Sequence, residues 1–405
     1  MRYFASALAL SAGLAALPAG AEVKLSDDVI RIGVINDQTG GYSDYQGPGS
    51  VAAARMAIAD FGGTLNGKKI ELLVGDHQNK TDIGSGIARR WMDQDGVDMM
   101  IDFGNSSISL AVQELTRDKT VTIHVSTASD ALYGEKCSRT GFMWNYDSYA
   151  IGQAIGRSAR ETGAETWYMI VADYGFGTAM EAALTEVVKE TGGKVLGSVR
   201  HPVGTTDFSS FVLQAQASGA QMVALLNAGD DTTNSIKQAS DFGLVQGGQS
   251  LVGTVFYVTN VHGLGLDVAQ GLRVATPFIW NQDAESIAFT ERWRKEAGTE
   301  NAPTHLHAGV YSGTLHYLRA VAAAGTDDSM TVAEKMREMP VDDFYGKGSP
   351  IRADGRVMRD MYFAEVKKPE ESTGPWDYYK ILATMPAADV IRPVEKGNCG
   401  YLKKG

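Results

Sequence analysis

The sequence predicts an α/β protein with two doubly wound lobes. From Val29 onward, short β-branched apolar runs alternate with stretches of helical periodicity, and the alternation restarts near Tyr149 with a second set of similar length. Regular alternation of this kind is typical of a parallel sheet covered by helices on both faces. A chain of 405 residues also exceeds what one hydrophobic core usually supports, so each set is expected to form its own lobe.

The strands and helices of each lobe follow from the spacing of apolar residues, which is continuous or alternating in strands and i, i+3, i+4 in helices. In the first set we predict strands at 30–35, 69–75, 99–103 and 121–125, and helices at 50–61, 83–94 and 108–118. In the second set we predict strands at 167–172, 194–199, 222–226 and 250–254, and helices at 149–161, 178–191, 208–218 and 232–242.

The last third of the chain contains too few strands for a lobe of its own. We predict strands at 272–277, 361–366 and 379–384, and helices at 285–297, 308–324 and 332–339. Since these helices need a sheet to cover, the chain must return to the existing lobes, with crossings near 142–146, after 272–277 and near 350–355. The first lobe is then 22–144 plus 276–350, and the second is 145–275 plus 351–405. Ligands of open α/β sheets bind beyond the carboxyl ends of the strands, so a cleft between the lobes is expected.

Residues 1–21 predict an export signal peptide. Arg2 precedes an apolar, Ala-rich stretch, and Ala19-Gly20-Ala21 fits the A-x-A rule for cleavage after Ala21. We therefore expect the mature protein outside the cytoplasm, in the periplasm.

Charge and cysteine content restrict the partners and the compartment further. The net charge of −11 at pH 7 repels nucleic acid, so no nucleic-acid partner is expected. In an oxidising compartment the two cysteines, Cys137 and Cys399, are expected to form a disulfide, with two free thiols as the alternative.

Two polar strand-to-helix loops predict a binding site for a small carboxylate. Asn105, Ser106 and Ser107 follow one strand, and Ser126 and Thr127 follow the next. Their hydroxyls and free N–H groups lie at a helix N-terminus, where the macrodipole favours an anion. Capping is the commoner use of these residue types, and a cap whose N–H groups stay partly unsatisfied can serve both roles.

Aromatic residues gather where predicted strands end, which is the expected edge of the cleft. A core position is the ordinary explanation for any one of them, but not for so many at strand ends. They are Tyr42, Tyr45, Trp144, Tyr146, Tyr174, Phe176, Phe256, Tyr257 and Trp280.

The familiar cofactor and metal motifs are not convincing in this chain. Residues 47–52 match G-x-G-x-x-A, but they begin ten residues after Asp37 and Pro48 removes a required N–H donor, so no cofactor is expected. His305-x-His307 lacks further ligands, so no metal site is expected. His307 and Tyr311, spaced i, i+4, are instead placed on one helix face that can turn toward the cleft.

The order and spacing of several segments are similar to a known family. These segments are the leader, residues 30–34 followed by Thr39-Gly40, the loop Asn105-Ser106-Ser107, residues 172–177 (Ala-Asp-Tyr-Gly-Phe-Gly) and residues 307–311 (His-Ala-Gly-Val-Tyr). Together they resemble the Leu/Ile/Val-binding (type I) periplasmic substrate-binding proteins of ABC transporters over nearly the whole mature chain. The resemblance implies two Rossmann-like lobes joined by a three-strand hinge, a monomer without enzymatic activity, and delivery of a captured solute to an ABC permease.

The resemblance also implies roles for individual residues. In amino-acid binders of the family the first lobe holds the ligand carboxylate, a role that falls here on Ser106, Ser107, Ser126 and Thr127. The second lobe supplies an aromatic side chain and an acid for the ligand ammonium. The aromatic position is matched by Tyr174 or Phe176.

The chain departs from that pattern at the acid. Residues 252–261, where the acid is expected, contain Phe256 and Tyr257 and no carboxylate. Asp230 or Asp231 could substitute, although an N-cap is the more ordinary role for both. The aromatic residues and the cysteine pair resemble a branch of the family associated with aromatic carboxylates, and a branched-chain or other amino acid is the competing ligand.

Two functions of other classes remain open from the sequence. One is a secreted α/β enzyme whose site includes His307 and Asp230, and the other is a sensing module that presents its closed lobes to a membrane receptor. Because no nucleophile–base pair, metal set or cofactor motif occurs, a binding protein for an aromatic or apolar carboxylate is the favoured prediction.

Overall fold

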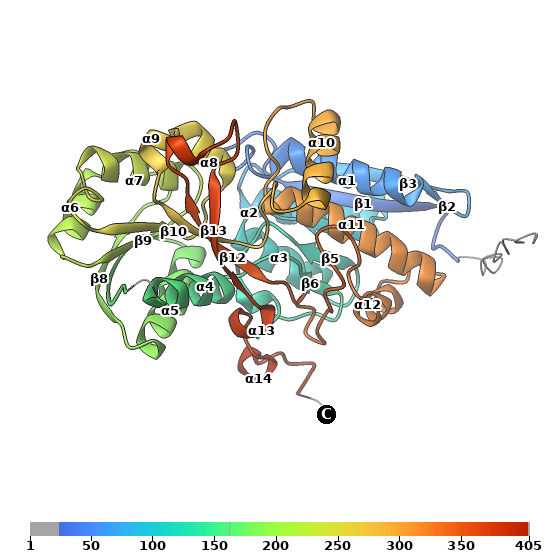
Figure 1. The fold of residues 1–405 in the computed structure, drawn as a ribbon. Coiled ribbons are helices and arrows are strands. Elements are labelled where there is room, and N and C mark those ends of the chain that lie inside the picture. Colours follow the sequence, from blue (N-terminus) through green and yellow to red (C-terminus); the bar gives the residue numbers. More distant parts are fainter. Residues whose placement is uncertain (1–23, 162, 404–405) are drawn as a thin grey trace, which may run out of the picture.

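The computed structural model describes residues 24–161 and 163–403, and its strands form two sheets (Figure 1). The predicted leader, residues 1–21, lies outside the described residues. The first sheet has the strand order β2-β3-β1-β4-β5-β6, and the second has the order β13-β12-β11-β10-β9-β7-β8. The predicted fold class, two doubly wound α/β lobes, is confirmed.

The first sheet is formed by the first third of the chain. Its strands are β1 (Val29–Asn36), β2 (Thr64–Leu65), β3 (Lys68–Asp76), β4 (Met99–Asp102), β5 (Val121–His124) and β6 (Gly141–Met143). The helices along it are α1 (Gly47–Phe61), α2 (Thr81–Arg90) and α3 (Ser106–Thr116). Strand β1 pairs in parallel with β3 on one side and with β4 on the other, so the strand order reverses there. The loops after β1 and β4 therefore meet at a topological switch point, the usual position of a ligand in such sheets.

The second sheet repeats this arrangement. Its strands are β7 (Thr166–Ala172), β8 (Lys194–His201), β9 (Met222–Leu226), β10 (Ser250–Gly253), β11 (Arg273–Thr276), β12 (Met361–Val366) and β13 (Tyr379–Met385). Its helices are α4 (Ser148–Glu161), α5 (Gly175–Glu190), α6 (Ser209–Ala217), α7 (Asp230–Asp241), α8 (Val258–Leu264) and α9 (Leu266–Ala269). Strand β7 lies between β8 and β9, all parallel, so a second switch point follows β7 and β9. Strands β12 and β13 join antiparallel at the far edge.

The chain passes between the two sheets three times. It leaves the first sheet after β6, returns after β11 with α10 (Ala284–Ala297), α11 (His305–Ala324) and α12 (Ser329–Glu338), and leaves again before β12. Helices α10 and α11 pack against α1 of the first sheet, and Figure 1 shows this orange group beside the blue strands. Near the third passage, Met143 and Arg356 form a parallel bridge, so the first and third passages lie side by side.

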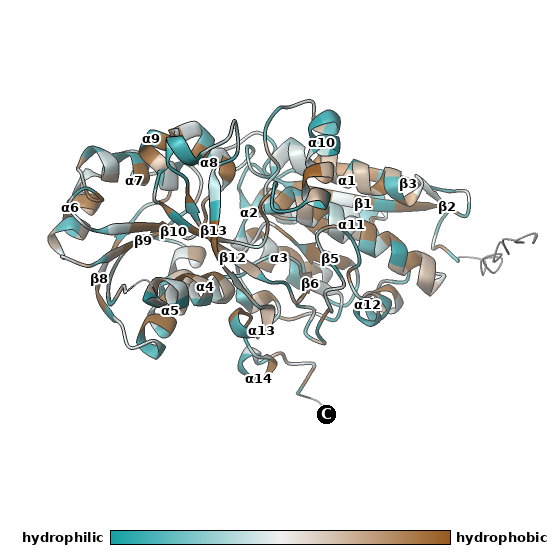
Figure 2. Ribbon diagram, in the orientation of Figure 1, coloured by the Kyte–Doolittle hydropathy of each residue, from teal (hydrophilic) through white to brown (hydrophobic). Residues whose placement is uncertain are grey.

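The hydrophobic pattern explains the strand and helix positions. The side chains of Ile30, Ile32 and Val34 in β1 have no exposed surface, and Figure 2 shows hydrophobic strands with hydrophilic residues on the outward helix faces. All predicted strands and helices occur, with ends shifted by a few residues. One predicted helix, 83–94, is interrupted because α2 ends at Arg90 and a wider π-type turn, Trp91–Asp95, follows.

Several short elements were not predicted. They are β2, β6, α8, α9, α13 (Ala387–Val390) and α14 (Val394–Gly397). Each is too short to show a period, and β6 lies in the segment that the sequence assigned to the first crossing.

The C-terminal segment returns to the first lobe. A disulfide joins Cys137 to Cys399, and Arg392 donates to the Asp130 carboxylate at 2.7 Å. This places α13 and α14 below the two sheets in Figure 1. Among the described residues, no helix is both long and apolar enough to cross a membrane.

Candidate functional site

A cavity lies where the two switch points face each other. Residues from both sheets and from the first passage line it, and none of these lining residues is Asp, Glu, Lys or Arg. They are Tyr45, Gly104, Asn105, Ser106, Ser126, Thr127, Ala128, Tyr146, Tyr174, Phe176, Ala228, Val255 and Tyr257. The cavity measures about 30 Å³, which is room for roughly one or two water molecules.

The first lobe contributes hydroxyl groups and a helix N-terminus. Asn105 caps α3 because its side-chain oxygen accepts from the backbone N–H of Ser107 at 2.8 Å. Ser106, the first residue of the helix, is buried, and its hydroxyl accepts from the Thr127 hydroxyl at 3.1 Å. The proton of the Ser106 hydroxyl is therefore free to be donated into the cavity. Together with the positive end of α3, this arrangement suits an anion.

Ser126 differs from its neighbours because its proton is already used. Its hydroxyl donates to the carboxylate of Asp102, a fully buried residue at the end of β4, and its backbone N–H donates to the Asp102 carbonyl at 3.2 Å. With Asp102 ionised, Ser126 can offer only oxygen lone pairs to a ligand. The predicted donor role of Ser126 is therefore not available in this protonation state.

Aromatic rings form the opposite walls of the cavity. Tyr45 follows β1 and Tyr257 begins α8, and their rings stack across the two lobes with centroids 4.4 Å apart. The hydroxyls of Tyr146 and Tyr257 are 3.3 Å apart, and Tyr174 contacts Phe176 with ring centroids at 5.8 Å. Such a wall favours a flat, apolar ligand body, because stacked or edge-on rings add stability beyond the buried area.

The phenols of this wall stay neutral at physiological pH. Burial raises the pKa of Tyr45, Tyr146, Tyr174 and Tyr257 above the usual value for tyrosine. They therefore act as neutral hydrogen-bond donors and acceptors and carry no charge that would oppose an anion.

The comparisons with known proteins identify the family of this chain. The family model of the periplasmic binding proteins matches residues 29–374. The chain belongs to the periplasmic binding protein family. It is 26% identical to the Leu/Ile/Val-binding protein homolog 6 of Brucella melitensis over 361 residues, which is 85% of this chain and 90% of that protein. Its family is that of the solute-binding proteins of ABC transporters, which bind small molecules and interact with permeases.

Solved structures of relatives share the fold of this binding protein. A periplasmic binding protein from Burkholderia mallei is 41% identical, with a TM-score of 0.88 over 92% of this chain and 99% of that chain. A branched-chain amino acid ABC transporter ligand-binding protein from Burkholderia xenovorans is 37% identical, with a TM-score of 0.84 and the same coverage. A solute binding protein from R. palustris, solved with 4-hydroxybenzoate, is 21% identical with a TM-score of 0.81 over 90% of this chain and all of that chain, which shows the shared fold alone.

Eight of the residues predicted from the sequence line the cavity of this binding protein, and five others do not. Tyr42 packs behind Tyr45, with ring centroids at 5.4 Å. Ser107 is exposed because the Asn105 cap turns the residue after Ser106 outward. Asp230 is exposed at the start of α7.

His307 and Phe256, the other two, have structural roles. His307 is buried and uses both ring nitrogens, because Nδ1 accepts from the Thr304 N–H at 3.1 Å and Nε2 donates to the Gln46 carbonyl at 3.1 Å. The His307 side chain therefore takes part in the cap at the start of α11, and neither ring nitrogen is left for a ligand. Phe256 packs in the core of the second lobe.

Five lining residues are not among the predicted site residues. Gly104, Ala128, Ala228 and Val255 carry no chemistry that a sequence pattern could reveal. The sequence places Tyr146 only among the aromatic residues at the cleft edge, without a ligand contact, because its partner Tyr257 is 111 positions away in the sequence.

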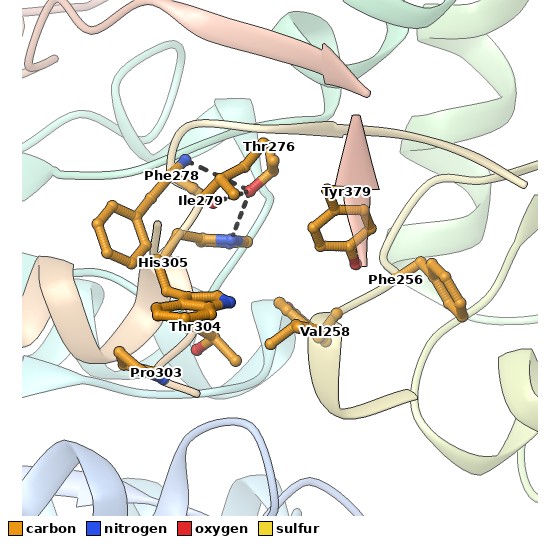
Figure 3. A pocket seen from close by; sticks show the side chains of 11 residues that line it. Phe256, Val258, Thr276, Phe278, Ile279, Pro303, Thr304, His305 and Tyr379 are labelled. Carbon is orange, nitrogen blue, oxygen red and sulfur yellow. Dashed lines mark hydrogen bonds between the residues drawn. The ribbon is translucent and has the colours of Figure 1, made fainter. Parts of the chain in front are cut away.

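Tyr257 also lines a second cavity, of about 20 Å³, which Figure 3 shows. Figure 3 shows His305 and Tyr379 on opposite sides of it, with His305 Nδ1 bonded to the Thr276 hydroxyl at 3.2 Å. The volume suits roughly one water molecule. The first cavity is the candidate ligand site because of its position, beyond the carboxyl ends of the strands at both switch points. The part of the chain that the structure describes holds no group of three or more His, Cys, Asp or Glu residues arranged for a metal ion.

Proposed function

We propose that this binding protein captures a small carboxylate with an aromatic or apolar body and delivers it to an ABC permease. The observation that carries the proposal is the composition of the cavity wall. Hydroxyls and a helix N-terminus lie on one side and aromatic rings lie on the other. No charged side chain lines the cavity, so none can contact a ligand ammonium directly. An unpaired ammonium buried in such a site would be costly, whereas a ring would stack on the tyrosines.

The same proposal includes capture by lobe closure. Ligand pockets usually measure about 300–1,000 Å³, so a cavity of about 30 Å³ must widen to admit an aromatic acid. We infer that the lobes, 22–144 plus 276–350 and 145–275 plus 351–405, separate about the three passages, while the C-terminal end of the chain stays beside the first lobe because Cys399 is bonded to Cys137. We also infer that the protein acts as a monomer in the periplasm after removal of residues 1–21.

The expected affinity follows from the contacts available. Each charge-assisted hydrogen bond to the carboxylate contributes about 1.5–3 kcal/mol. A ring that buries about 150–250 Å² adds roughly 4–6 kcal/mol at 25 cal/mol/Å². After the cost of association, dissociation constants in the micromolar range or below are expected.

A branched-chain or other amino acid is the second candidate ligand. It is supported by the names of the Brucella and Burkholderia xenovorans relatives. The two acids that the sequence offers for a ligand ammonium, Asp230 and Asp231, do not line the cavity. Asp230 is exposed, and the Asp231 carboxylate accepts from the Gly204 N–H at 3.1 Å. An amino-acid ligand would have to recruit one of these acids.

A matched pair of ligands separates the two candidates. Calorimetric titration is done with 3-phenylpropanoate and with phenylalanine. The two compounds share the ring and the carboxylate, and only phenylalanine has an α-ammonium group. We expect 3-phenylpropanoate to bind and phenylalanine to bind at least tenfold more weakly, because the ammonium has no partner. Binding of phenylalanine or leucine alone, abolished by Asp230→Asn or Asp231→Asn, would instead establish the amino-acid function.

Two adjacent serines test the carboxylate loop. Ser106→Ala removes a buried donor at the cavity and should weaken acid binding by about 1–3 kcal/mol, which is roughly five- to a hundred-fold. Ser107→Ala is the matched control, because Ser107 is exposed and should leave the affinity unchanged. Calorimetry on both variants decides the point, and equal affinities in the two would remove the loop from the site.

A further inference from the structure

Asp102 is a buried acid directly behind the ligand cavity. Its side chain has no exposed surface, and it is the last residue of β4, paired with Ile35 of β1 and His124 of β5. One carboxylate oxygen accepts from the Ser126 hydroxyl and the other accepts from the Asn36 side-chain amide at 2.8 Å. Ser126 lines the cavity, so a single hydroxyl separates Asp102 from a bound ligand.

The backbone holds Asp102 in an unusual conformation. Its φ angle is +96°, and the next residue, Phe103, has a φ of +76°. Conformations of this kind cost of order 1–3 kcal/mol for each residue and are concentrated at functional sites. Asparagine and aspartate tolerate positive φ better than most residues, which makes asparagine the least disruptive replacement here.

No cation faces Asp102 among the described groups packed around it. From β5, His124 stands opposite Asp102 in register, and burial lowers its pKa to about 3, so its ring is neutral. From the first passage, Tyr146 is also neutral, because burial raises its pKa. From α1, only the non-titrating Ser50 contributes. After β1, the Asp37 carboxylate accepts instead from the backbone N–H groups of Gly40 and Tyr42.

A ligand carboxylate at this position would place two anions on either side of one hydroxyl in a buried site. Like charges that share a site cannot both stay ionised, and the usual result is one bound proton. Burial already raises the pKa of Asp102 to about 6 without a ligand. A ligand carboxylate that approaches Ser126 raises the pKa of Asp102 further, because it is a second negative charge.

We propose that Asp102 takes up one proton from solvent when the binding protein captures a carboxylate. The protonated acid then donates to the Ser126 oxygen, which releases the Ser126 proton for donation to the ligand. One O–H bond forms at Asp102, no other covalent bond changes, and the complex gains one proton. Asp102 is a positioning residue, because it acts on the ligand through Ser126. This inference rests on the proposed capture of an acid.

The direct test is the number of protons taken up on binding. Calorimetric titration of the wild-type protein with 3-phenylpropanoate in phosphate and in Tris buffer gives this number, because the two buffers differ in ionisation enthalpy. We expect close to one proton per ligand at pH 7.5 in these buffers, and a value near zero at pH 5 in a pair of buffers that titrate near pH 5 and differ in ionisation enthalpy. The affinity should fall about tenfold per pH unit above the free-state pKa, since one proton is linked to binding.

Two variants separate this coupling from a structural role. Asp102→Asn imitates the protonated acid, because its amide N–H can donate to Ser126 and its oxygen can accept from Asn36. It should take up no proton, show no pH dependence between pH 5.5 and 8, and bind the acid more tightly than the wild type at pH 8. Asp98→Asn is the control. Asp98 directly precedes β4, its pKa is raised to about 7 by burial, and its carboxylate accepts from the Arg31 N–H at 2.7 Å; it does not line the cavity.

Each outcome has one meaning. If 3-phenylpropanoate binds without proton uptake at pH 7.5, the inference is wrong and the proposed function stands. If phenylalanine or leucine binds without proton uptake and 3-phenylpropanoate does not bind, the inference about Asp102 and the proposed function are both wrong. The same conclusion holds if none of these three compounds binds. If Asp102→Asn does not fold, the wild-type proton count still decides the matter, and Asp98→Asn should keep the wild-type count.

Discussion

Replacement of Arg356 by methionine should lower the free energy of unfolding by about 3–5 kcal/mol. Arg356 and Asp147 form an ion pair at 2.9 Å in which neither side chain has any exposed surface. The guanidinium also donates to the carbonyls of Val357 and Asn145, at 2.8 and 3.1 Å. Since these partners belong to the first and third passages between the lobes, the variant leaves an unpaired buried carboxylate and several unpaired carbonyls at the hinge.

Urea unfolding at equilibrium measures this loss, and an exposed pair of equal length provides the control. Arg160 and Glu165 are also 2.9 Å apart, but their side chains are 39% and 64% exposed. Arg160→Met should therefore cost less than about 1 kcal/mol. Addition of Asp147→Asn to the Arg356→Met variant should recover part of the loss, because it removes the uncompensated charge. Equal losses at the buried and exposed pairs would contradict the argument.

The fold was predictable because its signals are local. Each lobe is built from apolar runs such as Val29–Asn36 and Met222–Leu226, and the period of the pattern distinguishes strand from helix within a few residues. The return of the last helices to the first lobe was also predictable, because helices without new strands need an existing sheet. The short elements, such as Gly141–Met143, were not predictable, because three residues carry no period.

The candidate site was predictable in its position and only partly in its chemistry. The rule that ligands lie beyond the carboxyl ends of strands selected Ser106, Thr127 and Phe176, which the cavity brings together. What the sequence could not show is which hydroxyl has a free proton. The bond from Ser126 to Asp102 spans 24 positions of sequence, and His307 is held by Gln46 at a separation of 261. Because Ser126 and His307 bind these distant partners, their polar groups stabilise the fold and their protons are not free for donation to a ligand.

Loss of the disulfide is the other change with a large expected effect on stability. Cys137 and Cys399 are 262 positions apart, and the chain-entropy model gives a stabilisation of about 5.6 kcal/mol for so long a loop. Strain and residual structure in the unfolded chain usually reduce this value, so we expect the double variant Cys137→Ser, Cys399→Ser to lose about 2–5 kcal/mol of unfolding free energy.

The ligand site should survive that change, which makes affinity the internal control for the disulfide variant. The C-terminal segment keeps another contact with the first lobe, because Arg392 donates to Asp130 at 2.7 Å. The Arg392 carbonyl also accepts from Arg352, near the third passage, at 2.7 Å. None of these residues lines the cavity. Urea unfolding of the oxidised wild type and the double variant, each with and without ligand, measures both quantities. If the double variant has the same unfolding free energy as the wild type, the disulfide does not restrict the unfolded chain and the prediction is wrong. A lost affinity would show instead that the tail shapes the cleft.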